Sequence, residues 1–268
     1  MLATLAWSAI ASAVSDRATG NLSLRACRDD PTAVMARRAA FARSLGFAPG
    51  DLVCAEQVHG DRIVRVGVRD RGAVVPGADG LITAEPGVLL LLLFADCVPV
   101  CLLDPEAPAV GIAHAGWKGT VGRIAAGTVA AMVEAFGSRP DRLRAAIGPS
   151  IGGCCYEVSH GIAEEIQASA PHPAPGAHRP TPPASGYPAP GARYAAPGTR
   201  PVVRPGRRGR PHADLAAANR AQLLGAGLRP ENVALAGLCT ACRVDRFFSH
   251  RAEAGLAGRF GAAIGIVR

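Results

Sequence analysis

Apolar runs separated by glycine, proline and short polar stretches dominate the chain. The longest run falls within 87–101, which lies between prolines and is too short for a typical helix, so we predict a buried strand there that ends at Asp96 and Cys97. Strand-like apolar segments occur at six other places. These predicted strands are 52–58, 62–68, 110–114, 143–147, 233–238 and 260–267.

Other segments have the apolar spacing and the end signals of helices. We predict helices at 31–45, 121–136, 158–168 and 214–224. Asp29 or Asp30 is a plausible N-cap of the first helix and Ser159 of the third, and Gly137 closes the second. Strands and helices alternate imperfectly, which favours an α/β fold class in the form of a mixed α+β layered domain, with mixed β-sheets flanked by helices.

The segment 171–211 differs from the rest of the chain. It contains 12 prolines, six glycines and seven arginines in 41 residues, and no acidic residue. Such a composition buries too little apolar surface to offset the entropy of ordering, so we predict a disordered, mobile insertion within a single domain spanning 1–268. The formal charge is +8, and removing these seven arginines leaves +1. The folded part therefore carries no basic signature, and we expect no nucleic-acid partner.

Cysteine usage and apolar segments bear on the compartment. Eight cysteines are spread over 268 residues, unlike a short secreted disulfide scaffold, and this favours a reducing cytoplasm. The apolar segment 1–14 has Ala11-Ser12-Ala13 but lacks the basic start of a signal peptide. The run 88–94 is far shorter than the roughly 18 residues of a membrane span. We expect a cytoplasmic protein without a membrane partner.

Three residues of the types that serve as zinc or copper ligands lie at predicted strand ends or in the loops just after them: His59, Cys97 and His114. Two imidazoles and one thiolate are typical of a catalytic zinc site, in which water or substrate takes the fourth position. Taken singly, each histidine is equally typical of a hydrogen-bonded loop residue, and Cys97 of a small buried side chain.

Four further cysteines form two local pairs. Cys154 and Cys155 lie in a glycine-rich loop and allow a cysteine hydrolase as an alternative. Adjacent cysteines more often pack beneath a loop. Cys239 and Cys242 have CxxC spacing, but no second CxxC accompanies them, which disfavours a redox or structural-zinc role.

Several strings, in order along the chain, resemble the motifs of the YfiH-like family, also called laccase-domain or polyphenol oxidoreductase proteins. They are Gln57-Val58-His59-Gly60, Ala78-Asp79-Gly80-Leu81-Ile82-Thr83, Ala95-Asp96-Cys97-Val98-Pro99-Val100, His114-Ala115-Gly116-Trp117-Lys118-Gly119 and the segment 147–158. Similar strings follow at 214–219, 239–242 and 247–251. The resemblance covers roughly residues 20 to 260 apart from the insertion.

The resemblance implies a zinc-dependent purine nucleoside phosphorylase with adenosine deaminase activity, acting on adenosine, inosine, guanosine and S-methyl-5'-thioadenosine. It implies that His59, Cys97 and His114 bind the metal within the nucleoside pocket. Phosphorolysis also requires cationic groups for phosphate. Arg17 and Arg251 are candidates, Lys118 and Arg123 could line the same pocket mouth, and Gln57 is a further candidate for substrate binding. Asp96 could orient a ligand or act as acid and base.

Two other function classes compete with the phosphorylase. A copper-dependent polyphenol oxidase corresponds to the family's older name, but multicopper chemistry requires more histidines than the two near Cys97. A nucleic-acid binder could use the arginine-rich insertion, although Tyr187 and Tyr194 are its only aromatic residues. The expected partners are purine nucleosides and phosphate, in a monomer or small homo-oligomer.

Overall fold

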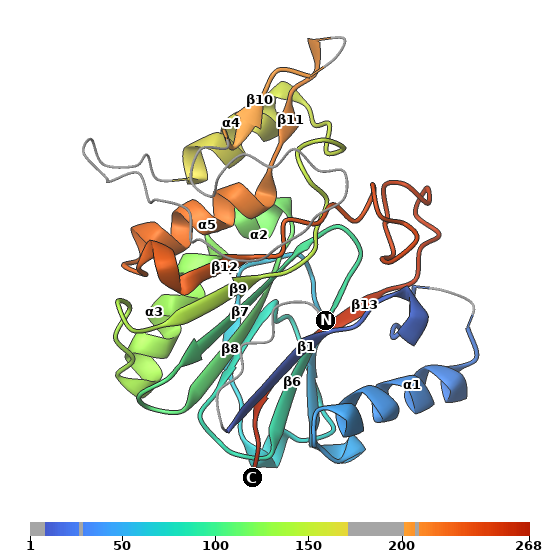
Figure 1. Cartoon of the computed structure of the whole chain (residues 1–268), viewed down its shortest axis with the longest axis vertical. Helices are drawn as coiled ribbons and strands as arrows, with labels where there is room; N and C mark the ends of the chain where they lie inside the picture. The colour runs from blue at the N-terminus through green and yellow to red at the C-terminus, as the bar shows by residue number, and fades with distance from the viewer. Residues whose placement is uncertain (1–8, 27–28, 171–200, 207–208) are drawn as a thin grey trace, which may run out of the picture.

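The longest apolar run forms β6 (Val88–Phe94), the central strand of a five-stranded sheet. The computed structural model describes residues 9–26, 29–170, 201–206 and 209–268 (Figure 1). In spatial order, the strands of this first sheet are β1 (Ile10–Val14), β13 (Phe260–Ile266), β6, β2 (Leu52–Ala55) and β4 (Val74–Val75). β13 pairs antiparallel with both β1 and β6, whereas β2 runs parallel to β6.

A six-stranded sheet holds most of the remaining strands. Its spatial order is β12 (Val233–Leu235), β9 (Arg144–Ile147), β7 (Val98–Asp104), β8 (Ala109–Ala115), β5 (Gly80–Thr83) and β3 (Ile63–Arg65). β7 pairs antiparallel with β8 and β9, and β12 runs parallel to β9. A separate two-stranded ribbon joins β10 (Val203–Arg204) to β11 (His212–Ala213).

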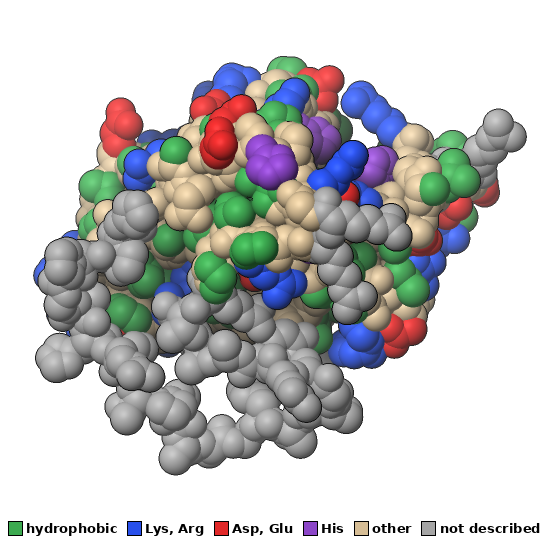
Figure 2. All heavy atoms as spheres, turned by 90° about the horizontal axis from the view of Figure 1, so that it is seen from above, with side chains coloured by type: hydrophobic (Ala, Val, Ile, Leu, Met, Phe, Trp, Pro, Cys, Tyr) green, Lys and Arg blue, Asp and Glu red, His purple; other side chains and the backbone are tan. Residues whose placement is uncertain are grey.

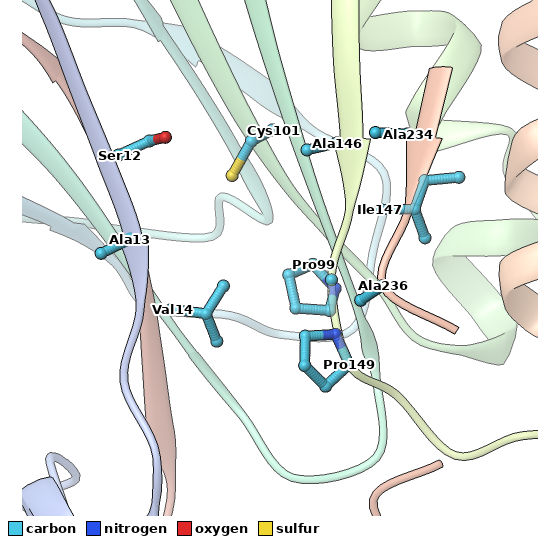
Figure 3. Close-up of a pocket in the computed structure, with 11 residues that line it drawn as sticks. Ser12, Ala13, Val14, Pro99, Cys101, Ala146, Ile147, Pro149, Ala234 and Ala236 are labelled. Atoms are coloured by element: carbon cyan, nitrogen blue, oxygen red, sulfur yellow. The ribbon is translucent and has the colours of Figure 1, made fainter. Parts of the chain in front are cut away.

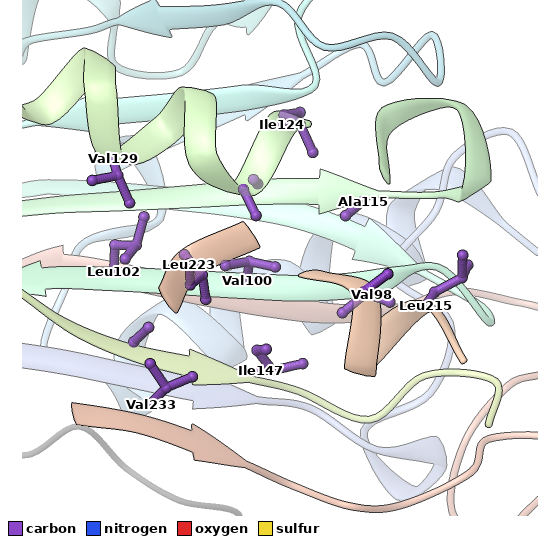
Figure 4. Close-up of a cluster of buried hydrophobic side chains, with 14 of the residues drawn as sticks. Val98, Val100, Leu102, Ala115, Ile124, Val129, Ile147, Leu215, Leu223 and Val233 are labelled. Carbon is purple, nitrogen blue, oxygen red and sulfur yellow. The ribbon is translucent and has the colours of Figure 1, made fainter. Parts of the chain in front are cut away.

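Helices cover the outer faces of the two sheets (Figure 1). α1 (Pro31–Ser44) packs on the first sheet. The six-stranded sheet is covered by α2 (Trp117–Val121), α3 (Ile124–Phe136), α4 (His160–Ser169) and α5 (Leu215–Gly225). Figure 4 shows side chains from α3 and α5 meeting those of β7, β9 and β12 in this helix-covered core. The order of layers is therefore helix, sheet, sheet, helices.

Burial on both faces explains why the central strands are continuously apolar. Along β6, Leu90 and Leu92 pack between the two sheets, whereas Leu89 and Leu91 pack toward α1. β7 and β8 likewise alternate between the core shared by the sheets and the core under the helices. The predicted class of mixed sheets flanked by helices is confirmed.

Most predicted elements are present with shorter bounds. Asp30 caps α1 and accepts a hydrogen bond from the backbone N–H of Thr32, and Ser159 caps α4 by accepting from Ile162. Gly137, with a φ of 70°, ends α3 as predicted. These positions are set by local capping chemistry.

Two predictions about single elements are wrong. The segment 87–101 is not one strand: β6 ends at Phe94, next to the predicted end at Asp96 and Cys97, and after a left-handed φ of 85° at Asp96 the chain continues as β7 in the other sheet. The helix predicted at 121–136 begins only at Ile124, since Arg123, with a φ of 60°, separates it from α2. In both cases the element is interrupted by a non-glycine residue in the left-handed conformation, which the sequence pattern does not predict.

The N-terminal segment and the end of the predicted insertion each contribute one strand. Ile10–Val14 forms β1 and pairs with β13, so the apolar N-terminal segment supplies a sheet strand. In the predicted insertion, residues 171–200 and 207–208 lie outside the described residues, whereas Val203–Arg204 pairs with β11. Among the helices that the structure describes, none has the length and apolar character required to cross a bilayer.

Candidate functional site

Three segments far apart in the sequence meet at one end of the two sheets. Cys97 lies in the turn from β6 to β7, directly before Val98. His114 lies on β8, where it pairs with Pro99 of β7, so the antiparallel register brings it close to Cys97. His59 lies in the connection from β2 to β3. Strand pairing therefore assembles the three residues that the sequence singled out.

The three side chains form a compact donor set. Their ligand atoms all lie within 4.8 Å of one another. The rings of His59 and His114 have centroids 4.9 Å apart and an interplanar angle of 77°. His114 is buried, Cys97 is partly buried and His59 is exposed, so the set opens to solvent on the His59 side. Two imidazoles and a thiolate with one open side correspond to the donor pattern of catalytic zinc.

Asp79 organises this donor set from beneath. Its buried carboxylate accepts a hydrogen bond of 2.8 Å from Nδ1 of His114. Nε2 is therefore the ring nitrogen that could serve as a metal ligand. The same carboxylate accepts the backbone N–H groups of Val58, His59 and Gly60 at 3.1, 3.0 and 2.8 Å. One acid thus holds both the His114 ring and the loop that carries His59, as second ligand shells of metal sites do.

Electrostatics favours charged forms within the set. Burial by itself would raise the pKa of the Cys97 thiol, but the imidazoles of His114 and His59 outweigh burial and lower it to about 6. Burial would lower the pKa of His114, but the Cys97 thiolate and the Asp79 carboxylate raise it to about 9. Burial opposes ionisation of Asp79 as well, yet hydrogen bonds from His114 and Gly60 lower its pKa. Cys97 is thus available as a thiolate, the form that binds metals.

Strained backbone surrounds the three donors. Gln57, His59 and Asp96 adopt left-handed φ values of 60°, 62° and 85°. Non-glycine residues rarely adopt this conformation, and it often concentrates at functional sites. Gly116, the N-cap of α2, lies against Cys97, and a Cβ at this position would be 3.1 Å from Sγ of Cys97. Sequence reasoning could not foresee this close contact.

Asp79→Asn is expected to weaken Zn²⁺ binding by about 10- to 100-fold, the usual effect of removing a ligand's hydrogen-bond partner. The amide retains one acceptor oxygen but places an NH₂ group against backbone N–H donors. Competition with a chromogenic chelator measures the change. Asp141→Asn is the matched control, because Asp141 is a surface carboxylate paired with Arg229. Equal affinities in the two variants would contradict the role assigned to Asp79.

Asp96 connects the turn that carries Cys97 to the C-terminal segment. Its buried carboxylate accepts hydrogen bonds from the hydroxyl of Thr240 at 2.6 Å and from the backbone N–H of Arg251 at 2.7 Å. Its carbonyl oxygen accepts the N–H of Ile151. Both carboxylate oxygens are thus engaged in positioning neighbouring loops. An acid–base role for Asp96 stays a prediction.

Arg251 presents an exposed guanidinium next to this region. Its Nη1 donates to the carbonyl oxygen of Glu157 at 3.0 Å, and the group lies 5.2 Å from the Tyr156 ring. Burial raises the pKa of Tyr156 to about 12, and the charges of Cys97 and Asp96 act in the same direction. Tyr156 thus lies within electrostatic reach of both Cys97 and Arg251.

The other predicted binding residues have defined surroundings. Arg17 donates to Glu253 at 2.7 Å and lies 4.4 Å above the Phe248 ring, so it contacts the segment that carries Arg251. The amide of Gln57 exchanges two hydrogen bonds with the backbone of Leu93. Lys118 is exposed, with its Nζ 5.7 Å from the Trp117 ring. Substrate contacts by Arg17, Gln57 and Lys118 stay predictions.

Sequence reasoning assigned no role to Asp79, Tyr156 or Thr240. Asp79 and Tyr156 do occur within the family-like strings, and Thr240 lies between the cysteines of the CxxC pair. Their membership of those strings was the available signal. Their roles follow only from their contacts in the fold: Asp79 contacts His114, Tyr156 contacts Arg251 and Thr240 contacts Asp96.

The surface and the interior differ in chemical character. Figure 2, viewed from the end that carries β10 and β11, shows histidine side chains near lysine and arginine side chains. A cavity of about 30 Å³ lies elsewhere, lined by β1, β7 and β9 residues such as Val14, Pro99 and Ile147 (Figure 3). Burial raises the pKa of its Cys101 thiol to about 12, so this small apolar space lacks a reactive group.

Known proteins resemble this chain over most of its length. The family model described as multi-copper polyphenol oxidoreductase laccase matches residues 8–267. The chain is 41% identical over 261 residues to a purine nucleoside phosphorylase of Deinococcus radiodurans, covering 96% of this chain and 87% of that protein. It is 35% identical over 230 residues to adenosine deaminase RL5 of an unknown prokaryotic organism, covering 83% of this chain and 78% of that protein.

A solved structure shares the fold closely. The crystal structure of YlmD from Geobacillus stearothermophilus superposes with a TM-score of 0.83 at 35% identity, covering 97% of this chain and 93% of that one. The curated protein of that name, a purine nucleoside phosphorylase, is 39% identical over 244 residues, covering 88% of this chain and 80% of that protein. The match over nearly the whole chain shows that it belongs to the YfiH-like family of multi-copper polyphenol oxidoreductase laccase proteins.

Proposed function

We propose that the protein is a zinc-dependent purine nucleoside phosphorylase that also deaminates adenosine, with S-methyl-5'-thioadenosine, inosine and guanosine as further substrates for phosphorolysis. The observation that carries this proposal is the trio of His59, Cys97 and His114, open to solvent on one side, with the exposed Arg251 held by its backbone N–H to Asp96, the neighbour of Cys97. Relatives named purine nucleoside phosphorylase support the first activity, and a relative named adenosine deaminase supports the second.

The donor set fits a zinc ion. Asp79 holds Nδ1 of His114, so Nε2 of that ring would bind the metal after losing the proton that Cys97 and Asp79 stabilise, and the pKa of Cys97 is low enough for a thiolate at neutral pH. His59 completes the set from the solvent side. Bound zinc would supply Lewis acidity, which activates water for attack on adenine at neutral pH.

The chain's own residues would divide the remaining work. Arg251 is suited to hold phosphate, because a guanidinium binds phosphate oxygens through paired hydrogen bonds. The carboxylate of Asp96 accepts a hydrogen bond from the backbone N–H of Arg251, which fixes the backbone from which the guanidinium extends. Tyr156, next to Arg251, carries a protonated phenol that could donate a hydrogen bond to substrate. Glu253 orients Arg17 along the same segment.

A copper phenol oxidase is the competing function, and the family description names it. In the part of the chain that the structure describes, the groups that could hold a metal are this trio and a cluster of four cysteines. Several histidine-rich copper sites, which multicopper oxidation requires, are not among them. The metal chemistry of the described residues therefore favours zinc.

Product analysis with and without phosphate tests the proposal. Zinc-loaded protein given adenosine alone is expected to release inosine, whereas added phosphate should produce free base and ribose 1-phosphate in addition, because phosphate is then the attacking group. Chromatography of the products, with inosine and guanosine as parallel substrates, measures both channels. Release of no base from any purine nucleoside at saturating phosphate would refute the phosphorylase. Phenol-dependent oxygen uptake after copper loading would support the oxidase instead.

A further inference from the structure

Four cysteines meet at the edge of the six-stranded sheet, away from the His59 trio. Cys154 and Cys155 follow β9, and Cys239 and Cys242 follow β12. β9 and β12 are parallel neighbours, so the loops after their carboxyl ends lie side by side, and a parallel bridge joins Ser150 to Cys239. The second half-site that the CxxC pair lacked in the sequence is therefore the adjacent pair Cys154-Cys155.

The geometry of this four-cysteine cluster matches a metal site. The four sulfur atoms all lie within 4.8 Å of one another. Sγ of Cys242 is 3.6 Å from Sγ of Cys154 and 3.4 Å from Sγ of Cys155. Zinc–sulfur bonds of about 2.3 Å in a tetrahedron place sulfur atoms about 3.8 Å apart. All four residues are free cysteines.

Backbone groups already support a negatively charged sulfur. The N–H of Gly152 donates to Sγ of Cys239 at 3.2 Å, and the N–H of Cys242 donates to the same sulfur. Backbone donors directed at sulfur favour the thiolate, which is the form that binds metals. Arg204 on β10 contacts the loop that carries Cys154, donating from Nε to the carbonyl oxygen of Gly153 at 3.0 Å, and its guanidinium adds a compensating positive charge.

We propose that Cys154, Cys155, Cys239 and Cys242 bind a structural Zn²⁺ ion as a tetrathiolate. Binding forms four zinc–sulfur bonds and releases one proton from each thiol to solvent, so the occupied site carries a net charge of −2. A closed set of four sulfur ligands leaves no position for substrate, which distinguishes this site from the open trio. Its chemistry is independent of the proposed purine reaction.

A metal ion bound to the cluster would stabilise the loops that contact Asp96 and Arg251. Thr240 lies between the two CxxC ligands, and its hydroxyl donates to Asp96. Its backbone N–H donates to the carbonyl oxygen of Ser150, in the loop that leads to Cys154. A metal ion bound by both loops would hold them together and so stabilise these hydrogen bonds. It would link segments that lie more than 80 residues apart in the sequence.

A cysteine hydrolase agrees less well with these contacts. In the residues that the structure describes, Sγ of Cys154 and Sγ of Cys155 each contact another cysteine sulfur of the cluster. A nucleophilic thiol requires a base within hydrogen-bond distance. His212, the histidine bonded to this loop, directs its Nδ1 to the carbonyl oxygen of Gly153.

Metal content of matched variants tests the tetrathiolate. Elemental analysis of protein purified with reductant is expected to find about two zinc ions per chain, about one in Cys97→Ala, and about one in a variant carrying both Cys239→Ser and Cys242→Ser. Cys54→Ser is the control and should keep both, because Cys54 lies on β2, outside either group.

A second measurement leaves the cluster intact and so does not depend on how its variants fold. Cys97→Ala loaded with Co²⁺ should show the strong thiolate-to-cobalt charge-transfer band of four sulfur ligands, and a chelator should both abolish the band and lower the melting temperature. A Cys97→Ala protein that binds neither metal would overturn the proposal. So would a disulfide among the four cysteines, found by peptide mapping of protein purified with reductant.

Discussion

Cys97→Ala is expected to abolish both phosphorolysis and deamination, lowering kcat/KM by more than about 10³-fold. The substitution removes the thiolate that His114 and His59 stabilise, and with it the charge that holds the metal in the open trio. Metal Lewis acidity contributes several kcal/mol to such reactions, and about 4 kcal/mol corresponds to about 10³-fold in rate. Product assays with adenosine, in the presence and absence of phosphate, measure the two losses together.

Two controls separate this effect from damage to the fold. Cys54→Ala removes a partly buried cysteine on β2 and should retain full activity. Thermal unfolding of Cys97→Ala should remain cooperative, because the strand pairing of β7 with β8 does not involve its side chain. A Cys97→Ala protein with full metal content and undiminished turnover would show that the trio is not the metal centre.

Arg251→Ala is expected to reduce phosphorolysis by about 10- to 150-fold while deamination changes by less than about 3-fold. A charge-assisted hydrogen bond contributes about 1.5–3 kcal/mol, which corresponds to that range if the guanidinium holds phosphate. The substitution leaves the backbone N–H of Arg251 in place, so its hydrogen bond to Asp96 persists and the loop stays braced. The KM for phosphate should therefore rise while the metal content stays unchanged.

Conservative and remote variants sharpen this test. Arg251→Lys keeps the charge but loses the paired donors, so phosphorolysis should fall to an intermediate level. Arg229→Ala, at a surface arginine paired with Asp141, should leave both reactions unchanged. Equal losses of phosphorolysis and deamination in Arg251→Ala would instead indicate a structural role and would remove this residue from the phosphate site.

Local chemistry was sufficient to predict many of the elements. Asp30 and Ser159 cap their helices because a short polar side chain satisfies free N–H groups within the first turn. The apolar run at Val88–Phe94 indicated burial on both faces, and both faces are covered. The family-like strings contained all three residues of the trio, because a sequence motif can be recognised without knowing where the fold places its residues.

Long-range contacts decided the rest. Asp96 turns the chain from one sheet into the other, and its partners Thr240 and Arg251 lie 144 and 155 residues away. The sequence predicted that a strand ends at Asp96 and Cys97, but it could not reveal the passage into the second sheet, because the left-handed backbone of Asp96 is offset by hydrogen bonds that form only in the folded protein. The same holds for Asp79, whose carboxylate meets His114 through the pairing of β5 with β8.

The four-cysteine cluster shows the division between sequence and fold most directly. Its residue types and the CxxC spacing are written in the chain, but the sequence alone left Cys239 and Cys242 without a counterpart. Parallel pairing of β9 with β12 brings Cys154 and Cys155 alongside them. Composition and periodicity thus specified the elements and the kinds of ligand. Which ligands share a site was decided by strand register, because register depends on packing across the whole sheet rather than on neighbours along the chain.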